Sequence, residues 1–441
     1  MIVPCARLII WIAIVALPAA ALAGLLPPLF SMSLAVVALF LIVAAVDAVL
    51  GFGGLEGIEV LLPPVVRFSK DRPGAIEIQI KNEPQHAKAL RLGLSMPLEF
   101  SAPQEDMQVH LPGQALWSKL AWPCTPSRRG NFRLDQCRLE TLSPLGFWAV
   151  RTAAPVQSEL RVYPDLLRER NSAAALFLNR GAFGIHVQRQ IGKARDFEQL
   201  RDYLPGDGYE DIHWKATAKR GRPVTKIFQI ERTQEVYVVI DASRLSARLA
   251  PGGSSILERF ITAGLVLGLA AERQGDLFGL ITFSDRIEQF VRAKSGPSHY
   301  NLCRDSIYAL QPRPATPDFD ELASFIRLRL RRRALLVFLT SLDDPVLAES
   351  FVRDIDLLRR QHVILVNMMQ APEIRPMFSG APVEGLDELY RHLGGHILWN
   401  NLRGLEKTLQ RRGVRFTLLE DERLSAQLIT QYLSVKRRQL L

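Results

Sequence analysis

The feature that most constrains this chain is a run of 39 residues without a charge, between Arg7 and Asp47. One helical crossing of a bilayer needs ~20 apolar residues, so the run is long enough for about two crossings. Pro27 and Pro28 lie near the middle of the run, where proline would interrupt a helix. The sequence therefore predicts an N-terminal transmembrane helical hairpin.

We place the two helices at about residues 8–26 and 29–50, within a membrane segment that comprises residues 1–54. Each helix satisfies its own backbone hydrogen bonds inside the bilayer. A hairpin buried in the core of a soluble protein is the alternative. The length of the run and its lack of any charged residue disfavour that alternative. Asp47 is expected at the membrane interface, although a buried functional carboxylate remains open.

Positive charges predict the orientation of the hairpin. The predicted turn has none, and Arg7 precedes the first helix. Three basic residues follow the second helix, namely Arg67, Lys70 and Arg72. Because such flanks stay on the cytoplasmic side, the body is predicted to face the cytoplasm from the inner (cytoplasmic) membrane. A competing interpretation reads the first apolar stretch, with Ala21–Ala23, as a cleavable signal peptide, and the second helix would then still stop transfer.

The composition excludes several classes of protein. Lys and Arg total 55 against 45 Asp and Glu, which gives a net charge of +10. Such a surplus is expected beside an anionic inner leaflet. The densest basic cluster, residues 327–333, contains no aromatic residue for base stacking, so we expect no nucleic-acid partner. Four cysteines without a Cys-x-x-Cys pair exclude a disulfide scaffold and a zinc ribbon, and Cys124 and Cys137 are expected to be free thiols.

Residues 55–165 have the pattern of β-strands. Ala75–Ile80 alternates apolar and polar residues, as a half-buried strand does. Short apolar stretches separated by Pro and Gly follow at residues 90–94, 114–120 and 138–142. We predict a small antiparallel β-sandwich, which usually acts as a spacer or docking module. Arg128–Gly130 and Ser143–Gly146 are interpreted as tight turns without chemistry.

Residues 166–234 form a predicted connecting segment that is dense in charged and aromatic residues. Its candidate functional residues are Arg201, Tyr203, Gly206, Asp207, His213, Trp214 and Lys215. Glycines on both sides of Asp207 permit a turn with positive φ. Asp207, His213 and Lys215 have side chains capable of acid–base chemistry. We favour the alternative that these groups pair with one another and hold the segment against the following domain.

From residue 235 to residue 441, apolar strands alternate with amphipathic helices. The strand candidates are residues 236–240, 277–283, 335–339, 363–368 and 414–419. The helix candidates are residues 255–273, 320–333, 346–361, 398–412 and 422–438. In the first of these helices, Leu257, Phe260 and Ile261 share one face. Continuous apolar strands separated by such helices predict a doubly wound α/β domain with a mainly parallel sheet.

Ligands of doubly wound folds bind beyond the carboxyl ends of the strands. Asp241 directly follows the first predicted strand, and Ser243 lies two residues further along. A carboxylate and a hydroxyl are hard oxygen ligands that suit Mg²⁺. The same residues are also an ordinary start for a helix or turn, so the spacing alone leaves both interpretations open.

The stretch from Arg201 to Lys219, with its Arg-x-Tyr-x-x-Gly-Asp core and Trp-Lys-Ala-Thr-Ala-Lys ending, resembles the domain-of-unknown-function fifty-eight family. These are membrane-anchored bacterial and archaeal proteins with a von Willebrand factor A-like domain. The strand at Val236–Ser243, the paired apolar helices, the Arg-Arg-Gly turn and Ser143–Gly146 also fit the family. The resemblance implies a von Willebrand factor A-like fold for residues 235–441 and a motif that binds partners.

The resemblance also bears on the metal. The family's full metal-ion-dependent adhesion site reads Asp-x-Ser-x-Ser, and this chain has Leu245 at the third position. A later Asp is expected where Ser341 stands, and the nearest Asp residues are displaced. The resemblance therefore implies a degenerate metal site at Asp241 and Ser243. We expect no bound cofactor, and Mg²⁺ is the candidate ion for this site.

The resemblance also implies a partner, because members of the family look like partners of MoxR-type AAA+ ATPases. Such ATPases are associated with the activation or maturation of other proteins. The expected function is thus a non-enzymatic, membrane-anchored scaffold that binds such an ATPase and its protein clients. The sequence has no Walker-type loop, Gly-x-Ser-x-Gly elbow or His-Glu-x-x-His motif. One alternative is an exported adhesion-type module, which a Cys124–Cys137 disulfide would support. The other is a membrane-bound hydrolase that uses His213 and Asp207.

Overall fold

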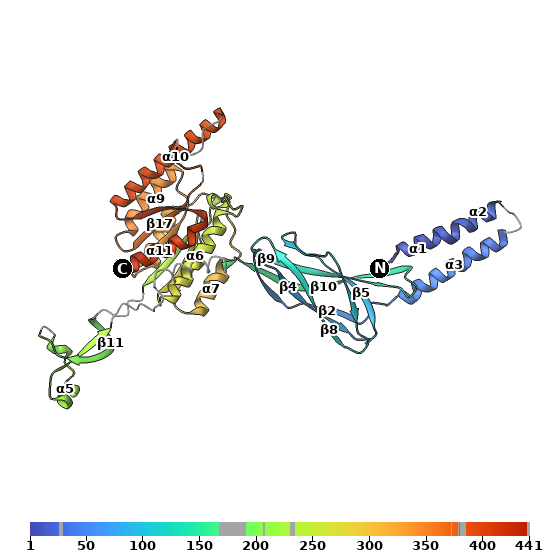
Figure 1. Ribbon diagram of the computed structural model, residues 1–441, viewed down its shortest axis with the longest axis horizontal. Coiled ribbons are helices and arrows are strands. Elements are labelled where there is room, and N and C mark those ends of the chain that lie inside the picture. The colour runs from blue at the N-terminus through green and yellow to red at the C-terminus, as the bar shows by residue number, and fades with distance from the viewer. Residues whose placement is uncertain are drawn as a thin grey trace. The chain divides into compact units, whose positions relative to one another are not determined.

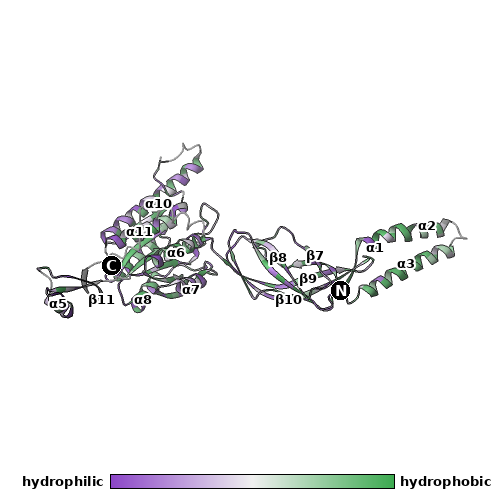
Figure 2. Ribbon diagram, turned by 60° about the horizontal axis from the view of Figure 1, so that its bottom comes forward, coloured by the Kyte–Doolittle hydropathy of each residue, from purple (hydrophilic) through white to green (hydrophobic). Residues whose placement is uncertain are grey.

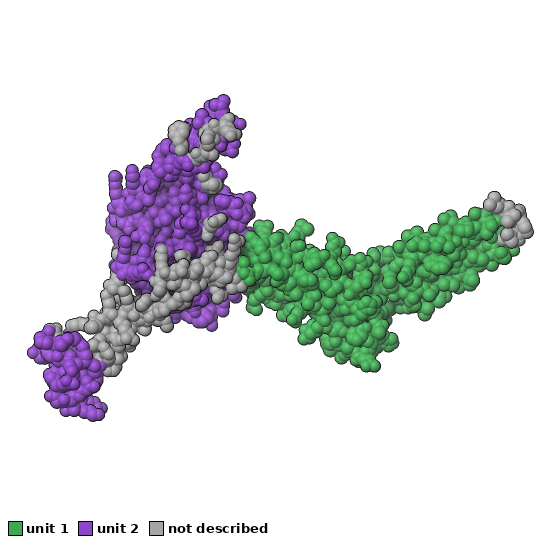
Figure 3. Space-filling view, viewed as in Figure 1, with its two compact units in different colours: residues 1–165 green, residues 166–441 purple. Residues whose placement is uncertain are grey.

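The computed structural model describes residues 1–25, 30–166, 191–205, 208–229, 234–371, 373–377, 379 and 385–438. The chain divides into two compact units, Met1–Asp165 and Leu166–Leu441, which Figure 3 shows in different colours. The first unit contains the apolar helices and the β-rich region. The second contains the motif segment and the α/β region.

The apolar run forms two helical arms that lie side by side (Figures 1 and 2). The first arm consists of α1 (Ala6–Trp11), a π-helical turn (Ile12–Ala16) and α2 (Leu17–Leu25). The second arm is α3 (Phe30–Gly51). Among the described residues, α3 is the one helix long and apolar enough to cross a membrane. The predicted break at Pro27 and Pro28 lies outside the described residues.

Two sheets form the β-sandwich of the first unit. One has the order β1-β10-β9-β5-β7, with β3 paired to β10, and the other has the order β2-β4-β8-β6. The strands are β1 (Ile2–Pro4), β2 (Ile58–Leu61), β3 (Val65–Ser69), β4 (Gly74–Asn82), β5 (Lys88–Leu94), β6 (Phe100–Ser101), β7 (Met107–Leu111), β8 (Trp117–Pro126), β9 (Gly130–Leu142) and β10 (Trp148–Tyr163).

The predicted alternation of apolar residues places the core of this sandwich correctly. Ile76, Ile78 and Ile80 of β4 are fully buried, and they belong to one cluster with Leu92 and Trp122. The expectation of a purely antiparallel sandwich is wrong in one place, because β3 pairs with β10 in parallel. Cys124 and Cys137 are free thiols in this core, and burial raises the pKa of each to about 11.

The strand β1 precedes the apolar helices, and no sequence pattern indicated it. It pairs with β10 in antiparallel register, with Ile2 opposite Val150 and Pro4 opposite Trp148. Cleavage near Ala23 would remove this strand from the sheet.

In the motif segment, β11 (Ile191–Asp202) and β12 (Val224–Gln229) form a two-stranded antiparallel sheet. The chain between them includes a 3-10 turn (Tyr209–Asp211) and the short helix α5 (Trp214–Arg220). The glycine after α5, Gly221, has a φ of 66°, which ends the helix in a left-handed conformation.

The α/β region contains a six-stranded sheet in the order β15-β14-β13-β16-β17-β18. The antiparallel strand β15 lies at one edge, and the remaining pairs are parallel. The strands are β13 (Glu235–Asp241), β14 (Leu277–Phe283), β15 (Ile287–Lys294), β16 (Ala334–Leu339), β17 (Val363–Met369) and β18 (Arg415–Leu419).

Helices cover both faces of this sheet, so the region is doubly wound, as predicted. One core cluster joins the sheet to α6 (Ile256–Arg273), α7 (Pro297–Ile307) and α11 (Leu424–Arg437). The other joins it to α8 (Phe319–Arg329), α9 (Pro345–Leu358) and α10 (Leu386–Arg411). Helix α8 ends at Arg329 rather than at the predicted residue 333, because Leu330 turns into the core in an extended conformation.

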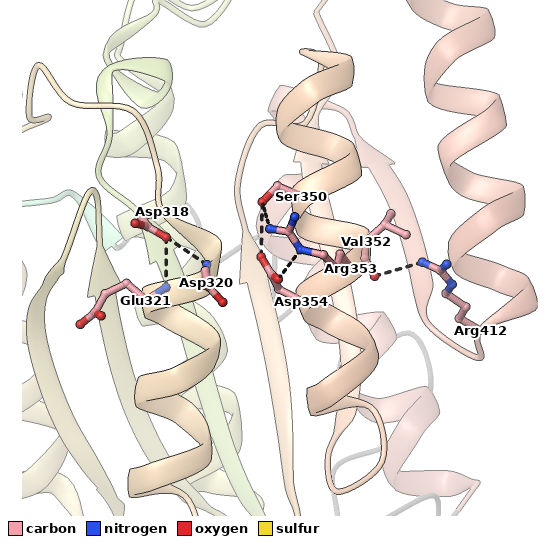
Figure 4. Close-up of polar contacts among 8 residues, drawn as sticks. All are labelled: Asp318, Asp320, Glu321, Ser350, Val352, Arg353, Asp354 and Arg412. Carbon is pink, nitrogen blue, oxygen red and sulfur yellow. Dashed lines mark hydrogen bonds and ion pairs between the residues drawn. The ribbon is translucent and has the colours of Figure 1, made fainter.

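Polar contacts fix the helices of the second face (Figure 4). Asp318 begins α8 by accepting the backbone N–H groups of Asp320 and Glu321, each at 3.0 Å. Arg412 follows α10 and donates to the carbonyl of Val352 in α9 at 3.0 Å. These contacts hold the helix ends in place beyond what apolar packing alone specifies.

The last helix, α11, is held to the sheet by a buried carboxylate. Asp276 is 1% exposed and precedes β14. It accepts hydrogen bonds from the Tyr432 hydroxyl, from Lys436 Nζ at 2.9 Å and from the backbone N–H of Gln234 at 3.2 Å. Tyr432 is fully buried, and burial together with the Asp276 charge raises its pKa. We call Asp276, Tyr432 and Lys436 the Asp276 cluster.

A buried histidine makes the stability of the α/β region depend on pH. His362 is 4% exposed, and neither ring nitrogen has a hydrogen-bond partner among the described residues. Burial, with the charge of Arg333, lowers its pKa from 6.5 to about 4. The unfolded chain therefore binds a proton at a higher pH than the folded chain, and stability falls as the pH drops from about 6.5 towards 4.

We expect wild-type protein to lose ~2 kcal/mol more unfolding free energy between pH 7 and pH 4.5 than His362→Leu does. Urea denaturation at the two pH values measures this difference. An equal loss in both proteins would mean that His362 does not contribute to the pH dependence.

Candidate functional site

The carboxyl edge of the α/β sheet holds the first candidate site. The sheet order reverses between β13 and β16, and the crevice at such a point is where doubly wound folds bind ligands. Asp241 ends β13, and Thr340 directly follows β16. The predicted position of Asp241 at the end of the first strand is thus correct.

The polar groups at this edge bind one another. Asp241 is 1% exposed; its Oδ1 accepts the backbone N–H of Ser243 at 2.8 Å, and its Oδ2 accepts the Thr340 hydroxyl at 2.7 Å. Burial raises the pKa of Asp241, and these hydrogen bonds oppose that rise. Ser243 Oγ accepts the N–H of Leu245 at 3.3 Å. Both predicted ligands therefore serve the local backbone.

This donor set does not fit a Mg²⁺ ion, which takes about six oxygen ligands in near-octahedral geometry. Leu245 supplies none, and the two later acids are committed elsewhere. Asp343 pairs with Arg248, and Asp344 accepts the N–H of Val346 at 2.8 Å to begin α9. In the part of the chain that the structure describes, no group of three or more His, Cys, Asp or Glu residues could hold a metal.

In the motif segment, His213 has a structural role. Its backbone N–H donates to the carbonyl of Val224 at 2.8 Å, and its Nδ1 accepts the N–H of Ala216 at 3.0 Å, which begins α5. Thr217 Oγ1 accepts the N–H of Val224 at 3.0 Å. Helix α5 is therefore fastened to β12 through His213 and Thr217, and the Nδ1 atom is occupied as an acceptor.

Of the other motif residues, Arg201 and Tyr203 lie in or directly after β11, whereas Trp214 and Lys215 are exposed. Tyr203 donates its N–H to the carbonyl of Pro223 at 3.0 Å and stacks on Tyr209, with ring centroids 6.3 Å apart. Arg201 lies in β11 opposite Thr225. Trp214 is 68% exposed and Lys215 is exposed as well. Gly206 and Asp207 lie outside the described residues.

The structure adds a polar site at Asp47 of α3. Asp47 is fully buried, as the alternative left open by the sequence had it, and it lies against the turn Ser143–Phe147. The Asp47 carboxylate accepts three hydrogen bonds, from Ser143 Oγ at 2.6 Å, from the N–H of Leu145 at 2.9 Å and from the N–H of Phe147 at 3.2 Å. We call these contacts the Asp47 junction.

A further hydrogen bond strengthens the Asp47 junction. Trp148 donates its indole N–H to the carbonyl of Ala44 in α3 at 2.8 Å, and Leu8, Ala44 and Phe147 form a small buried cluster. Ser143–Gly146 is a tight turn, as predicted, since the N–H of Gly146 donates to the carbonyl of Ser143 at 2.9 Å, and it also holds α3. The one signal in the sequence was Asp47 itself, a lone acid at the end of an apolar run.

Two solved bacterial structures are similar to part of this chain. One is the conserved hypothetical protein BatB from Bacteroides thetaiotaomicron, at 15% identity and a TM-score of 0.29, covering 46% of this chain and 99% of that one. The other is an aerotolerance-related membrane protein from Bacteroides fragilis, at 14% identity and a TM-score of 0.25, covering 41% of this chain and 98% of that one.

A curated relative in Bacillus subtilis (strain 168), the uncharacterized protein YeaD, is 26% identical over 148 residues. That match covers 32% of this chain and 36% of the relative, so it spans about a third of each protein. Residues 199–375, from the motif segment through β17, match the family described as "Protein of unknown function DUF58", so the resemblance to that family is confirmed for this range.

Proposed function

We propose that this protein is a membrane-anchored scaffold that binds other proteins on the cytoplasmic side of the inner membrane. The Asp47 junction is the observation that carries the proposal. It builds α3, a helix able to cross a membrane, directly into the sandwich. The body is then held at the bilayer by a fixed joint, with the first apolar arm as the second crossing.

We further propose that the protein acts through binding rather than catalysis and carries no metal. Both oxygens of Asp241 accept hydrogen bonds from neighbouring groups, and His213 Nδ1 begins a helix. A hydrolase would need these groups free to move protons to and from a substrate. Their structural roles favour a recognition surface.

The partner that we propose is a MoxR-type AAA+ ATPase, together with the proteins that it activates or matures. The match of residues 199–375 to the DUF58 family supports this choice. The binding surface would include Trp214, whose exposed indole resembles the aromatic anchors of protein interfaces.

Affinity capture from native membranes, followed by mass spectrometry, tests the proposed function. We expect the wild-type protein to recover an AAA+ ATPase and Trp214→Ala to recover at least about tenfold less, because buried aromatic anchors contribute ~2 kcal/mol or more at interfaces. Trp117→Ala is the matched control, since Trp117 is 48% exposed on β8 of the sandwich. It should leave the recovery unchanged.

Two results would contradict the proposal. If Trp214→Ala did not alter the captured set, the surface around Trp214 would be wrong. Spheroplasts treated with protease before lysis should yield an intact body. Digestion of the sandwich would place it outside the cell and support the exported adhesion-type module instead.

A further inference from the structure

A groove of about 960 Å³ lies along the outer edge of β18, between α10 and α11. Four consecutive residues of β18, Arg415–Leu418, form its floor. Helix α10 contributes Trp399 and Arg403 to one wall, and α11 contributes Gln427 and Gln431 to the other. The volume is at the upper end of the range for ligand pockets, ~300–1,000 Å³. We call this the β18 groove.

The floor of the β18 groove is an unpaired strand edge. The carbonyl of Leu419 accepts the N–H of Gln370 at 2.9 Å, so Leu419 turns its backbone towards β17. Because successive residues of a strand turn their backbone groups to opposite sides, Phe416 and Leu418 turn theirs to the open edge. β18 is the last strand in the sheet, and an open edge is a template for an added strand.

One buried group in the β18 groove lacks a partner. Gln431 is 8% exposed, and its Oε1 has no hydrogen-bond partner among the described residues. A buried amide oxygen without a donor costs ~1–3 kcal/mol. This atom is closed to solvent, so the open backbone edge of β18 is the feature that indicates a peptide as the ligand.

The charges of the β18 groove select the kind of peptide. Three arginines line it, Arg403, Arg415 and Arg423. Glu406 is the one acid among the lining residues that the structure describes, and it pairs with Arg403 at 3.0 Å. Arg423 pairs with Glu420 at 3.7 Å, and Arg415 contacts the Ser434 hydroxyl at 3.2 Å. Two of the three arginines are therefore matched by an acid, and Arg415 supplies the positive surplus of the groove.

We propose that the β18 groove binds an extended acidic peptide segment of a partner protein, which adds to the sheet as a strand beside β18. Its backbone pairs with Phe416 and Leu418, and its carboxylates meet the arginines. A second copy of this chain is disfavoured, because it would bring the same arginines against each other. The site uses neither Trp214 nor Asp241, so it stands or falls independently of the function proposed above.

Fluorescence anisotropy with the full-length protein in detergent tests this site. The probe is a labelled heptapeptide that alternates valine and glutamate. We expect saturable binding with a Kd on the order of 10 µM. Arg415→Glu should weaken it by at least about tenfold, because it replaces an attraction by a repulsion. Arg292→Glu, on the exposed face of the opposite edge strand β15, is the matched control and should change Kd less than about twofold.

A second probe keeps the test independent of protein folding. The same heptapeptide, N-methylated at every peptide bond, cannot donate backbone hydrogen bonds and should bind at least about tenfold more weakly. Equal binding of the two peptides, equal binding by Arg415→Glu, or no saturable binding would each overturn the proposal. A doubled mass by light scattering that Arg415→Glu abolishes would assign the edge to a second copy instead.

Discussion

Asp47→Ala should lower the free energy of unfolding of the first unit by about 3–5 kcal/mol. The substitution removes the acceptor of three hydrogen bonds and leaves the Ser143 hydroxyl and the N–H groups of Leu145 and Phe147 without a partner. Asp47 is fully buried, so water is excluded as a replacement acceptor. Thermal unfolding in detergent, followed by tryptophan fluorescence, measures the loss.

Two further variants separate the Asp47 junction from a general loss of charge. Asp47→Asn keeps an acceptor oxygen and should have an intermediate effect. Glu77→Ala removes a carboxylate from the exposed side of β4 and should change stability by less than about 0.5 kcal/mol. If Asp47→Ala behaved like Glu77→Ala, the helices would be attached to the sandwich by the chain alone.

We expect Asp276→Ala to destabilise the α/β region by about 3–5 kcal/mol. The change leaves the ammonium group of Lys436 and the fully buried hydroxyl of Tyr432 without the carboxylate that they share. Helix α11 would lose its polar attachment to the sheet. Denaturation by urea, followed by circular dichroism at a helical wavelength, measures the effect.

The double variant Asp276→Asn/Lys436→Met leaves no unpaired charge in the Asp276 cluster and should recover part of the lost stability. Glu349→Ala, which removes an exposed carboxylate from α9, is the matched control and should change stability by less than about 0.5 kcal/mol. A loss below 1 kcal/mol in Asp276→Ala would mean that apolar packing alone holds α11.

The buried strands of the α/β region were the most predictable elements. Residues 277–283 were predicted as a strand, and β14 has those bounds because a continuous apolar run fits a strand buried on both faces. Two elements of the α/β region escaped prediction. β15 is half-exposed and mixes charged with apolar residues, and α7 carries few apolar residues, so neither shows a clear period.

The polar sites were less predictable, because their partners are distant in the sequence. Asp47 and Ser143 are 96 residues apart, and Asp241 and Thr340 are 99 residues apart. No local pattern encodes such pairs; they appear once the sheets and helices have packed. His213 shows the opposite case, since its partners Ala216 and Val224 lie within eleven residues. The sequence predicted a structural role for His213 through pairing with Asp207 and Lys215, whereas its Nδ1 accepts the N–H of Ala216.

The position of β1 ahead of the apolar helices has a consequence for biogenesis. Ile2–Pro4 can enter its sheet only after Trp148–Val150 has left the ribosome, by which time the helices between them have long been available to the insertion machinery. In the membrane-anchored protein that we propose, insertion of the helices therefore precedes completion of the sandwich, and Ile2–Pro4 stays unpaired until β10 is available.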